Sequence, residues 1–407
     1  MSRRLLIWAT GILSGIMLAG CTDDSYRGTV DIDLVIERDI PHEVRMTIGQ
    51  PADIVDGTKG SGVIADVSGF QGKPFYVYAF NKDGLTTLNT TSVKDSIRCL
   101  VDGSLDKPES LMGREALWNP NTEYVEWASG DGPIYYPMGD GSGLIYNFFA
   151  YYLDDMTVEE SDFRRTENSV TIDIEIDGSQ DIMSSKAEPT ADQLAAIKDE
   201  KERVYRKYCS YSYYTALHGL HPNFVFKHHL VKFDFKLVPG GVSGATKNVN
   251  VEKIELVSKY KGAFTVADNN EVSSLGIQFY DDRKALELKE ADGSDFIHRV
   301  ISTFDGGSSV DGTIDDMGSL LVAPDVEYEM LITLSEEDEG NNVTHDPYPI
   351  VRSITMGTEE ARQFFSAGNE YLITITVYGK MDVKVNTDLL KWDDGGYYVP
   401  PTEDIPE

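Results

Sequence analysis

The stretch "FVFKHHLVKFDFKL", residues Phe224 to Leu237, decides how this chain folds. Apolar and polar residues alternate along it, which is the pattern of a half-buried β-strand. The alternation changes phase midway: the first face carries Phe224, Phe226, His228 and Leu230, and the other carries Val231, Phe233, Phe235 and Leu237. Because a one-residue shift reverses the buried face, we expect a bulge near Leu230 or a strand that passes between two packing layers.

Alternation of period two recurs along most of the chain, with Gly, Asp and Asn between the alternating segments. We expect strands at Val30–Ile36, 75–80, 145–153, 169–176, 249–257, 275–280, 326–334, 371–378 and 381–386. Many short strands separated by turn residues indicate β-sandwiches or barrels. The exception is one amphipathic helix near residues 191–208, for which Thr190 and Gln193 form a capping box. The fold class is therefore all-β, with a second domain starting near Asn223.

The N-terminus has the features of a secretory leader. Arg3 and Arg4 precede a mostly apolar run, Leu5–Leu18, which is shorter than the about 20 residues that a membrane-spanning helix needs. Leu-Ala-Gly-Cys then ends at Cys21, and this order resembles the lipobox of bacterial lipoproteins. That resemblance implies cleavage before Cys21 and attachment of lipid, including palmitate, to this residue. The acidic residues that follow resemble an export signal to the outer face of the outer membrane.

Composition restricts the partners. The formal net charge is -32, so phosphate backbones repel the chain and nucleic acid is not expected to bind. Hydrophobic residues make up 41% of the sequence, which is enough for packed cores. Once Cys21 carries lipid, Cys99 and Cys209 remain as thiols. An extracytoplasmic location permits a disulfide between them, but their spacing in sequence leaves this pairing open.

No motif predicts catalysis, a metal or a cofactor. His218, His221, His228 and His229 lie close together in sequence. Adjacent residues of a strand point to opposite faces, however, so His228 and His229 cannot enter one metal site. "DIEIDG", Asp173–Gly178, resembles the start of a calcium loop, but Ser184 stands where a glutamate is needed. The sequence contains no Gly-x-Ser-x-Gly elbow, His-Glu-x-x-His motif or phosphate loop. We therefore expect a protein that is not an enzyme.

Several segments together resemble the fimbrillin-like lipoproteins, which are subunits of type V outer-membrane pili. They are "PFYVYAFNKDG" (Pro74–Gly84), "IYYPMGDGSGLIYNFFAYYLDD" (Ile134–Asp155), "GSQDIMSSKA" (Gly178–Ala187), the Phe224–Leu237 stretch and "FFSAGNEYLITITVYGKMDVKVNTDLLKW" (Phe364–Trp392). This resemblance implies two transthyretin-like β-sandwich domains in tandem, at residues 28–222 and 223–395. Before them lie the signal peptide, 1–20, and an acidic tether, 21–27; a Pro-rich acidic tail, 396–407, follows them.

The resemblance also implies assembly by strand donation. A protease cuts after an arginine near the N-terminus, the first strand leaves, and an extended segment of another subunit fills the groove. In this sequence the leaving strand would be Val30–Ile36, and Arg38 or Arg45 would be the cleavage site. Pro400, Pro401 and Pro406 encode a donor strand poorly, because proline cannot donate a ladder hydrogen bond. We therefore expect a minor, tip or anchoring subunit at the cell surface, acting in adhesion or fimbria assembly.

The alternative is a surface glycan-binding lipoprotein of a nutrient-uptake complex. Aromatic side chains stack on sugars, and Trp118, Trp127, Tyr135 and Tyr136 lie in sequence that we interpret as loops. In either case the expected partners are the outer membrane, through the lipid, and other fimbrial subunits or a host surface or glycan.

Overall fold

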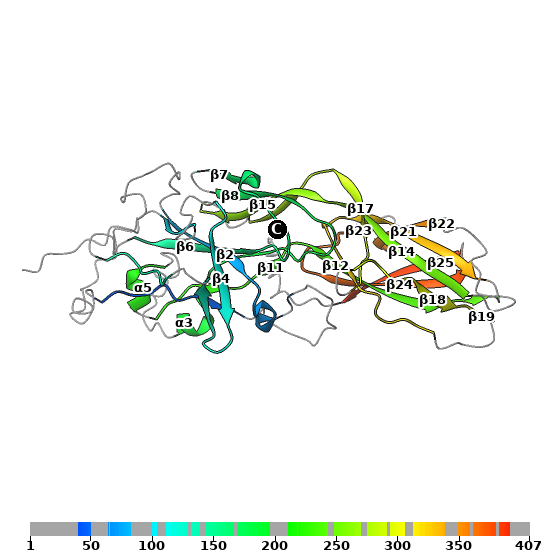
Figure 1. Cartoon of the computed structure of the whole chain (residues 1–407), viewed down its shortest axis with the longest axis horizontal. Coiled ribbons are helices and arrows are strands. Elements are labelled where there is room, and N and C mark those ends of the chain that lie inside the picture. Colours follow the sequence, from blue (N-terminus) through cyan, green and yellow to red (C-terminus); the bar gives the residue numbers. More distant parts are fainter. Residues whose placement is uncertain are drawn as a thin grey trace, which may run out of the picture.

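In the computed structural model, two β-sandwiches lie end to end along the long axis of the molecule (Figure 1). The structure describes residues 40–49, 64, 66–82, 99–103, 111–128, 132–138, 144–166, 169–195, 211–217, 219–242, 248–269, 275–290, 294–305, 312–337, 348–358, 361–379 and 382–390. Within these ranges, no helix is both long enough and apolar enough to cross a bilayer. The signal peptide, Cys21, Val30–Ile36, Arg38 and the tail 396–407 lie outside the described residues.

The N-terminal sandwich is built around a seven-stranded sheet in the order β11-β9-β6-β2-β4-β5, with β3 also paired to β2. Its strands are β2 (Phe75–Asn81), β3 (Cys99–Val101), β4 (Arg114–Asn119), β5 (Tyr124–Trp127), β6 (Tyr146–Tyr152), β9 (Met183–Lys186) and β11 (Lys227–His228). A four-stranded sheet, β16-β15-β8-β7, covers one face. Its strands are β7 (Phe163–Arg165), β8 (Ser169–Glu175), β15 (Lys261–Asp268) and β16 (Gly276–Phe279).

Both faces of the seven-stranded sheet are covered, and this explains its continuous aromatic strands. Every residue of β6, "YNFFAYY", is buried. Phe149 and Tyr151 pack toward β8 and β15, whereas Phe148 and Tyr152 belong to a second core on the opposite face. That second core is closed by chain segments rather than by another large sheet, among them η1 (Val67–Phe70), β1 (Thr47–Ile48), β10 (Asn223–Phe224) and α5 (Tyr213–Leu217).

The C-terminal sandwich packs the sheet β20-β12-β24-β25 against the sheet β17-β14-β21-β22-β23, with β18 paired to β14. The first sheet contains β12 (Val231–Pro239), β20 (Ser319–Val322), β24 (Glu370–Gly379) and β25 (Asp382–Leu390). The second contains β14 (Asn248–Lys259), β17 (Arg283–Glu287), β18 (Arg299–Ser302), β21 (Glu327–Glu337), β22 (Tyr348–Thr358) and β23 (Ala361–Gln363). Between the layers the Phe233 ring of β12 meets Tyr328 of β21 edge to face, with centroids 5.1 Å apart. A small parallel pair, β13 (Gly241–Val242) with β19 (Phe304–Asp305), completes this end.

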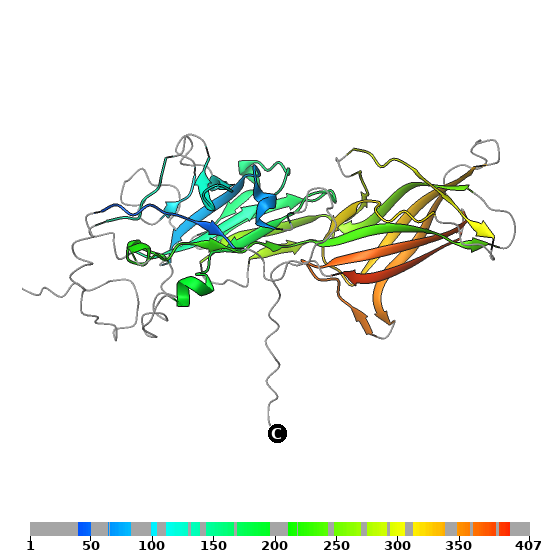
Figure 2. The same ribbon diagram turned by 90° about the horizontal axis from the view of Figure 1, so that it is seen from below.

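The chain crosses between the sandwiches more than once. Residues of the Phe224–Leu237 stretch begin in the N-terminal sandwich, as β10 and β11, and continue as β12 in the C-terminal one. The phase change in the sequence marks this passage between two cores. β14 then runs the length of the C-terminal sandwich, and after Tyr260 the chain enters β15, which pairs with β8. β15 and β16 therefore complete the N-terminal sandwich (Figure 2).

The structure confirms the predicted all-β fold with tandem sandwiches. It also confirms the predicted helix start, because α3 (Ala191–Ala195) follows a complete capping box. Thr190 donates its backbone N–H to Gln193 Oε1 at 3.0 Å, and Gln193 donates its own N–H to Thr190 Oγ1 at 3.1 Å. The rest of the predicted helix, 196–208, lies outside the described residues. The short helix α5 was not predicted, and the boundary at 222/223 stays a prediction.

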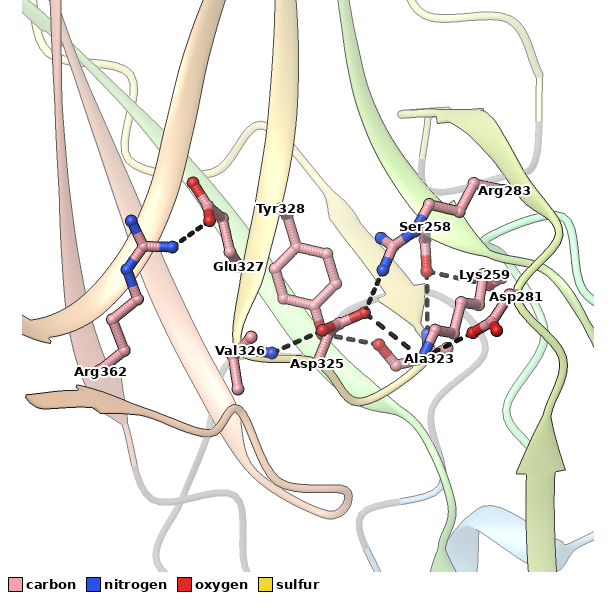
Figure 3. A network of polar contacts seen from close by, with 10 residues as sticks. All are labelled: Ser258, Lys259, Asp281, Arg283, Ala323, Asp325, Val326, Glu327, Tyr328 and Arg362. Carbon is pink, nitrogen blue, oxygen red and sulfur yellow. Dashed lines mark hydrogen bonds and ion pairs between the residues drawn. The ribbon is translucent and has the colours of Figure 1, made fainter. Parts of the chain in front are cut away.

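A polar network closes the C-terminal sandwich where β14 ends (Figure 3). Its centre is Asp325, whose carboxylate accepts hydrogen bonds from Arg283, at 2.7 Å, and from the backbone N–H of Val326, at 2.8 Å. Lys259 Nζ lies 3.7 Å from the same carboxylate. Tyr328 donates its hydroxyl to the carbonyl oxygen of Ala323 at 2.6 Å. Side chains from three strands and one loop are thereby fixed beside the crossing to β15.

Candidate strand-exchange site

The chain segment Ile40–Gly49, here called the ribbon, lies extended against the second core of the N-terminal sandwich. Its side chains alternate: Val44 and Met46 are buried, whereas Arg45 between them is exposed. An extended segment with one face inserted into a core has the form of a docked strand. The alternation of Val44, Met46 and Ile48 was present in the sequence, but the prediction placed the first strand only at Val30–Ile36.

Main-chain hydrogen bonds hold the N-terminal half of the ribbon to one neighbour. The N–H of Val44 donates to Ile134 O at 2.7 Å, and the N–H of Tyr136 donates to His42 O at 2.9 Å. These two bonds flank the antiparallel pair Glu43 and Tyr135. Beyond them, Tyr213 of α5 donates its hydroxyl to Ile40 O at 2.9 Å, and its ring meets that of His42 edge to face.

The C-terminal half of the ribbon is held more firmly. Met46 is fully buried and accepts a hydrogen bond from the N–H of Val125 at 2.9 Å. The parallel pair of β1 with β10 follows: Thr47 donates its N–H to Pro222 O at 2.9 Å, and Gly49 donates to Phe224 O at 2.8 Å. The Thr47 hydroxyl also donates to Asn223 Oδ1 at 2.9 Å. Arg45 thus lies where a lightly held half of the ribbon meets a firmly held half.

Arg45, one of the two predicted cleavage sites, presents its side chain to solvent. The side chain is 56% exposed, and its Nε lies 3.9 Å from a carboxylate oxygen of Glu43. Its guanidinium also lies 5.8 Å from the centre of the Tyr124 ring. These contacts are weak at a surface, so they leave the arginine available to a protease pocket. The other predicted site, Arg38, lies outside the described residues.

The histidines that lie close together in sequence have separate surroundings in the structure. His228 Nδ1 lies 2.8 Å from Asp181 Oδ1, and both residues are buried. His229 points the other way and lies with Nε2 2.7 Å from the hydroxyl of Ser184. Burial lowers the pKa of His229 to about 3 and also lowers the pKa of His221. Among the described residues, no three His, Cys, Asp or Glu side chains gather as metal ligands. His218 lies outside the described residues.

The aromatic residues of the glycan-binding alternative do not form one exposed platform. Trp118 and Trp127 were interpreted as loop residues, and this was wrong, because they belong to β4 and β5. Trp118 pairs with buried Val125, and Trp127 pairs with buried Ala116, so both indoles share the core-facing side. Tyr136 is 2% exposed and Tyr135 is 47% exposed. Neighbouring β-residues that face opposite sides explain this division.

Cys99 lies in a partly buried polar contact. Arg165 donates a hydrogen bond to its Sγ at 3.4 Å and two to the Asp102 carboxylate, at 2.9 and 2.8 Å. Cys209 lies outside the described residues, so its pairing with Cys99 stays open.

No protein-family model and no curated protein matches the chain. Solved structures align with 86–87% of the chain. A fimbrial protein from Bacteroides vulgatus is 12% identical over 86% of this chain and 99% of that one, with a TM-score of 0.45. A candidate cell adhesion protein from Bacteroides uniformis is 16% identical over 87% and 98% of the two chains, with a TM-score of 0.43. A fimbrial anchor protein from Porphyromonas gingivalis is 10% identical over 86% and 99%, with a TM-score of 0.32. At such low identities and TM-scores, the function of this chain has to be argued from its own residues.

Proposed function

We propose that this protein is a lipid-anchored component of a cell-surface fimbria, in a tip or anchoring position, and that it joins other subunits by β-strand exchange. The proposed role is adhesive or structural and not enzymatic. Cys21 would carry the lipid, which holds the chain at the outer membrane. The lipobox-like sequence and the resemblance of the strand segments to fimbrillin-like proteins support this proposal.

One structural observation carries the exchange step. The ribbon is docked through main-chain hydrogen bonds, and the residues after Arg45 are held more firmly than the residues before it. Upstream of Arg45, three hydrogen bonds and one buried side chain, Val44, hold the chain. Burying a valine contributes about 1.5–3 kcal/mol, and each hydrogen bond about 1 kcal/mol net. An incoming strand that offers the same bonds can replace such a segment. Cleavage after Arg45 would release residues 21–45, including the lipidated Cys21, and uncover the backbone of Ile134–Tyr136. A cleaved chain would then stay at the surface through its partner subunits and no longer through its own lipid.

An arginine-specific protease tests the proposal on the full mature chain. We expect one truncated product whose first residue is Met46, and we expect higher oligomers of that product to form with time. Arg45→Ala should abolish the product, whereas Arg38→Ala should not. A product that begins at residue 39 would show that the protease cuts after Arg38 and not after Arg45. The absence of both truncation and oligomers would contradict the proposal.

A disulfide lock provides a matched control. Glu43 and Tyr135 are directly opposed in an antiparallel pair, so Glu43→Cys combined with Tyr135→Cys can join the ribbon to its neighbour. The oxidised double variant should keep the segment before Arg45 attached after cleavage and stay monomeric, and reductant should restore both release of the segment and oligomerisation. Each single variant should behave as the unmodified chain does. If the locked chain oligomerises as fast as the reduced one, this part of the ribbon does not leave.

A further inference from the structure

Three charged side chains meet on adjacent strands of the C-terminal sandwich. Lys232 and Asp234 lie on one face of β12, and Glu370 starts β24. The two strands are parallel, and Lys232 and Glu370 are in direct register. Lys232 Nζ lies 2.8 Å from Glu370 Oε1 and 3.3 Å from Asp234 Oδ2. Neighbouring strands therefore place one amine between two carboxyl groups.

The cluster is withdrawn from water. Side-chain exposure is 4% for Lys232, 8% for Glu370 and 17% for Asp234. Two carboxylates and one ammonium leave an excess negative charge, which is costly in such a site. Burial, together with a hydrogen bond that the neutral Glu370 carboxyl group donates to Asp234, raises the pKa of Glu370 to about 7 against the opposing effect of Lys232. A neutral carboxyl group beside an amine is the starting arrangement for amide formation.

We propose that the Lys232 amine condenses with the Glu370 carboxyl group, and that the resulting amide joins β12 covalently to β24. Side chains fixed at contact distance replace a bimolecular encounter by an intramolecular one, which lowers the entropic part of the barrier. Exclusion of water also protects the product from hydrolysis. The cross-link would tie residue 232 to residue 370 and so close most of the C-terminal sandwich into one covalent ring.

Asp234 is placed to carry the proton. Ser319 donates its hydroxyl to Asp234 Oδ1, which leaves Oδ2 turned toward Lys232 Nζ. Asp234 takes one proton from the Lys232 ammonium, and the freed amine attacks Glu370 Cδ. The Nζ–Cδ bond forms, and the bond from Cδ to one carboxyl oxygen breaks. That oxygen leaves as water with the Glu370 proton and a second proton from Lys232. The third stays on the amide nitrogen, so atoms and charge balance without an oxidant.

Peptide mass spectrometry of the full chain tests this cross-link. Trypsin should release residues 228–236 joined to residues 363–380, lighter by one water molecule than the sum of the two peptides, with no cut after Lys232. Lys232→Arg keeps the charge but removes the amine, so it should give only separate peptides. Recovery of both peptides unlinked from the unmodified chain would overturn the proposal.

Two further variants separate reaction from folding. Asp234→Asn keeps the size of the side chain but cannot accept the proton, so we expect the cross-link to be lost while the far-ultraviolet circular dichroism is unchanged. Persistence of the cross-link in Asp234→Asn would overturn the role of Asp234. Lys236→Arg is the matched control, because Lys236 lies on the same face of β12 and pairs with exposed Asp315. It should leave the joined peptide unchanged apart from the substituted residue.

Discussion

Leu321 donates its backbone N–H to the carbonyl oxygen of Gly178 at 2.8 Å, across the junction between the two sandwiches. Gly178 lies in the turn between β8 and β9 with φ +100°, a backbone conformation that favours glycine. A Cβ at this position would meet Leu320 Cδ2 at 2.8 Å and Leu286 Cβ at 3.3 Å. The turn therefore fits against the C-terminal sandwich only without a side chain.

Gly178→Ala should lower the free energy of unfolding by about 2–4 kcal/mol, through backbone strain and overpacking together. Urea denaturation measures the change. Gly132→Ala is the control, because a Cβ there meets nothing within 4 Å, and it should change stability by less than about 0.5 kcal/mol. Equal effects of the two substitutions would show that the junction is not tightly packed around Gly178.

Removal of the Asp325 carboxylate should destabilise the network of Figure 3. Its side chain is 13% exposed and neutralises two cations, Arg283 and Lys259. Asp325→Ala leaves both without this partner and removes the acceptor of the Val326 N–H, so we expect a loss of about 2–4 kcal/mol. Arg362→Ala breaks the neighbouring pair with Glu327, in which both side chains are more than a third exposed, and should cost less than about 1 kcal/mol. Thermal unfolding of the two variants side by side measures both losses. A lower unfolding midpoint for Arg362→Ala than for Asp325→Ala would refute this expectation.

The strands and turns could be predicted because every second side chain enters a core, which leaves a pattern in the sequence. In Phe224–Leu237 the change of phase in the alternation even marked where the chain passes from one core to the other. The ribbon was missed because the alternation of Val44, Met46 and Ile48 is too short to stand out, and the backbone hydrogen bonds that hold the ribbon do not depend on residue type. The pairing of β8 with β15 was also missed, because these strands are about ninety residues apart in sequence and pair through backbone hydrogen bonds. Trp118 and Trp127 were misplaced because turn residues around them resemble those of a loop.

Stability should depend on pH through His229, because burial holds its pKa at about 3 in the folded chain against an ordinary value of 6.5. His228 and Lys227 lower the pKa further, and Asp181 opposes them. Below pH 6.5 the unfolded chain takes up a proton on His229 that the folded chain does not. The stability that depends on a neutral His229 is therefore fully present above pH 6.5. It falls as pH decreases toward 3, by at most about 1.4 kcal/mol per pH unit.

Urea midpoints measured at pH 7 and pH 4.5 should therefore differ more for the unmodified chain than for His229→Gln. The glutamine does not titrate but can still bond the Ser184 hydroxyl, which lies 2.7 Å from His229 Nε2. Carboxyl groups elsewhere contribute equally to both proteins and cancel in the comparison. Identical pH dependence of the two proteins would mean that His229 takes up its proton in the folded state near its ordinary pKa.

Trp127 should act in stability and not in sugar binding. Its indole packs against the second core, and the guanidinium of buried Arg114 lies 5.7 Å from the ring centre. Trp127→Ala should lower the free energy of unfolding by about 2–3 kcal/mol, because it removes both the partly buried ring and the cation–π contact. Tyr135→Ala removes a side chain that is 47% exposed and should cost less than about 1 kcal/mol. The discriminating measurement is a glycan array run on both variants beside their unfolding curves. Saturable glycan binding that Trp127→Ala removes without any change in stability would overturn this assignment and restore the glycan-binding alternative.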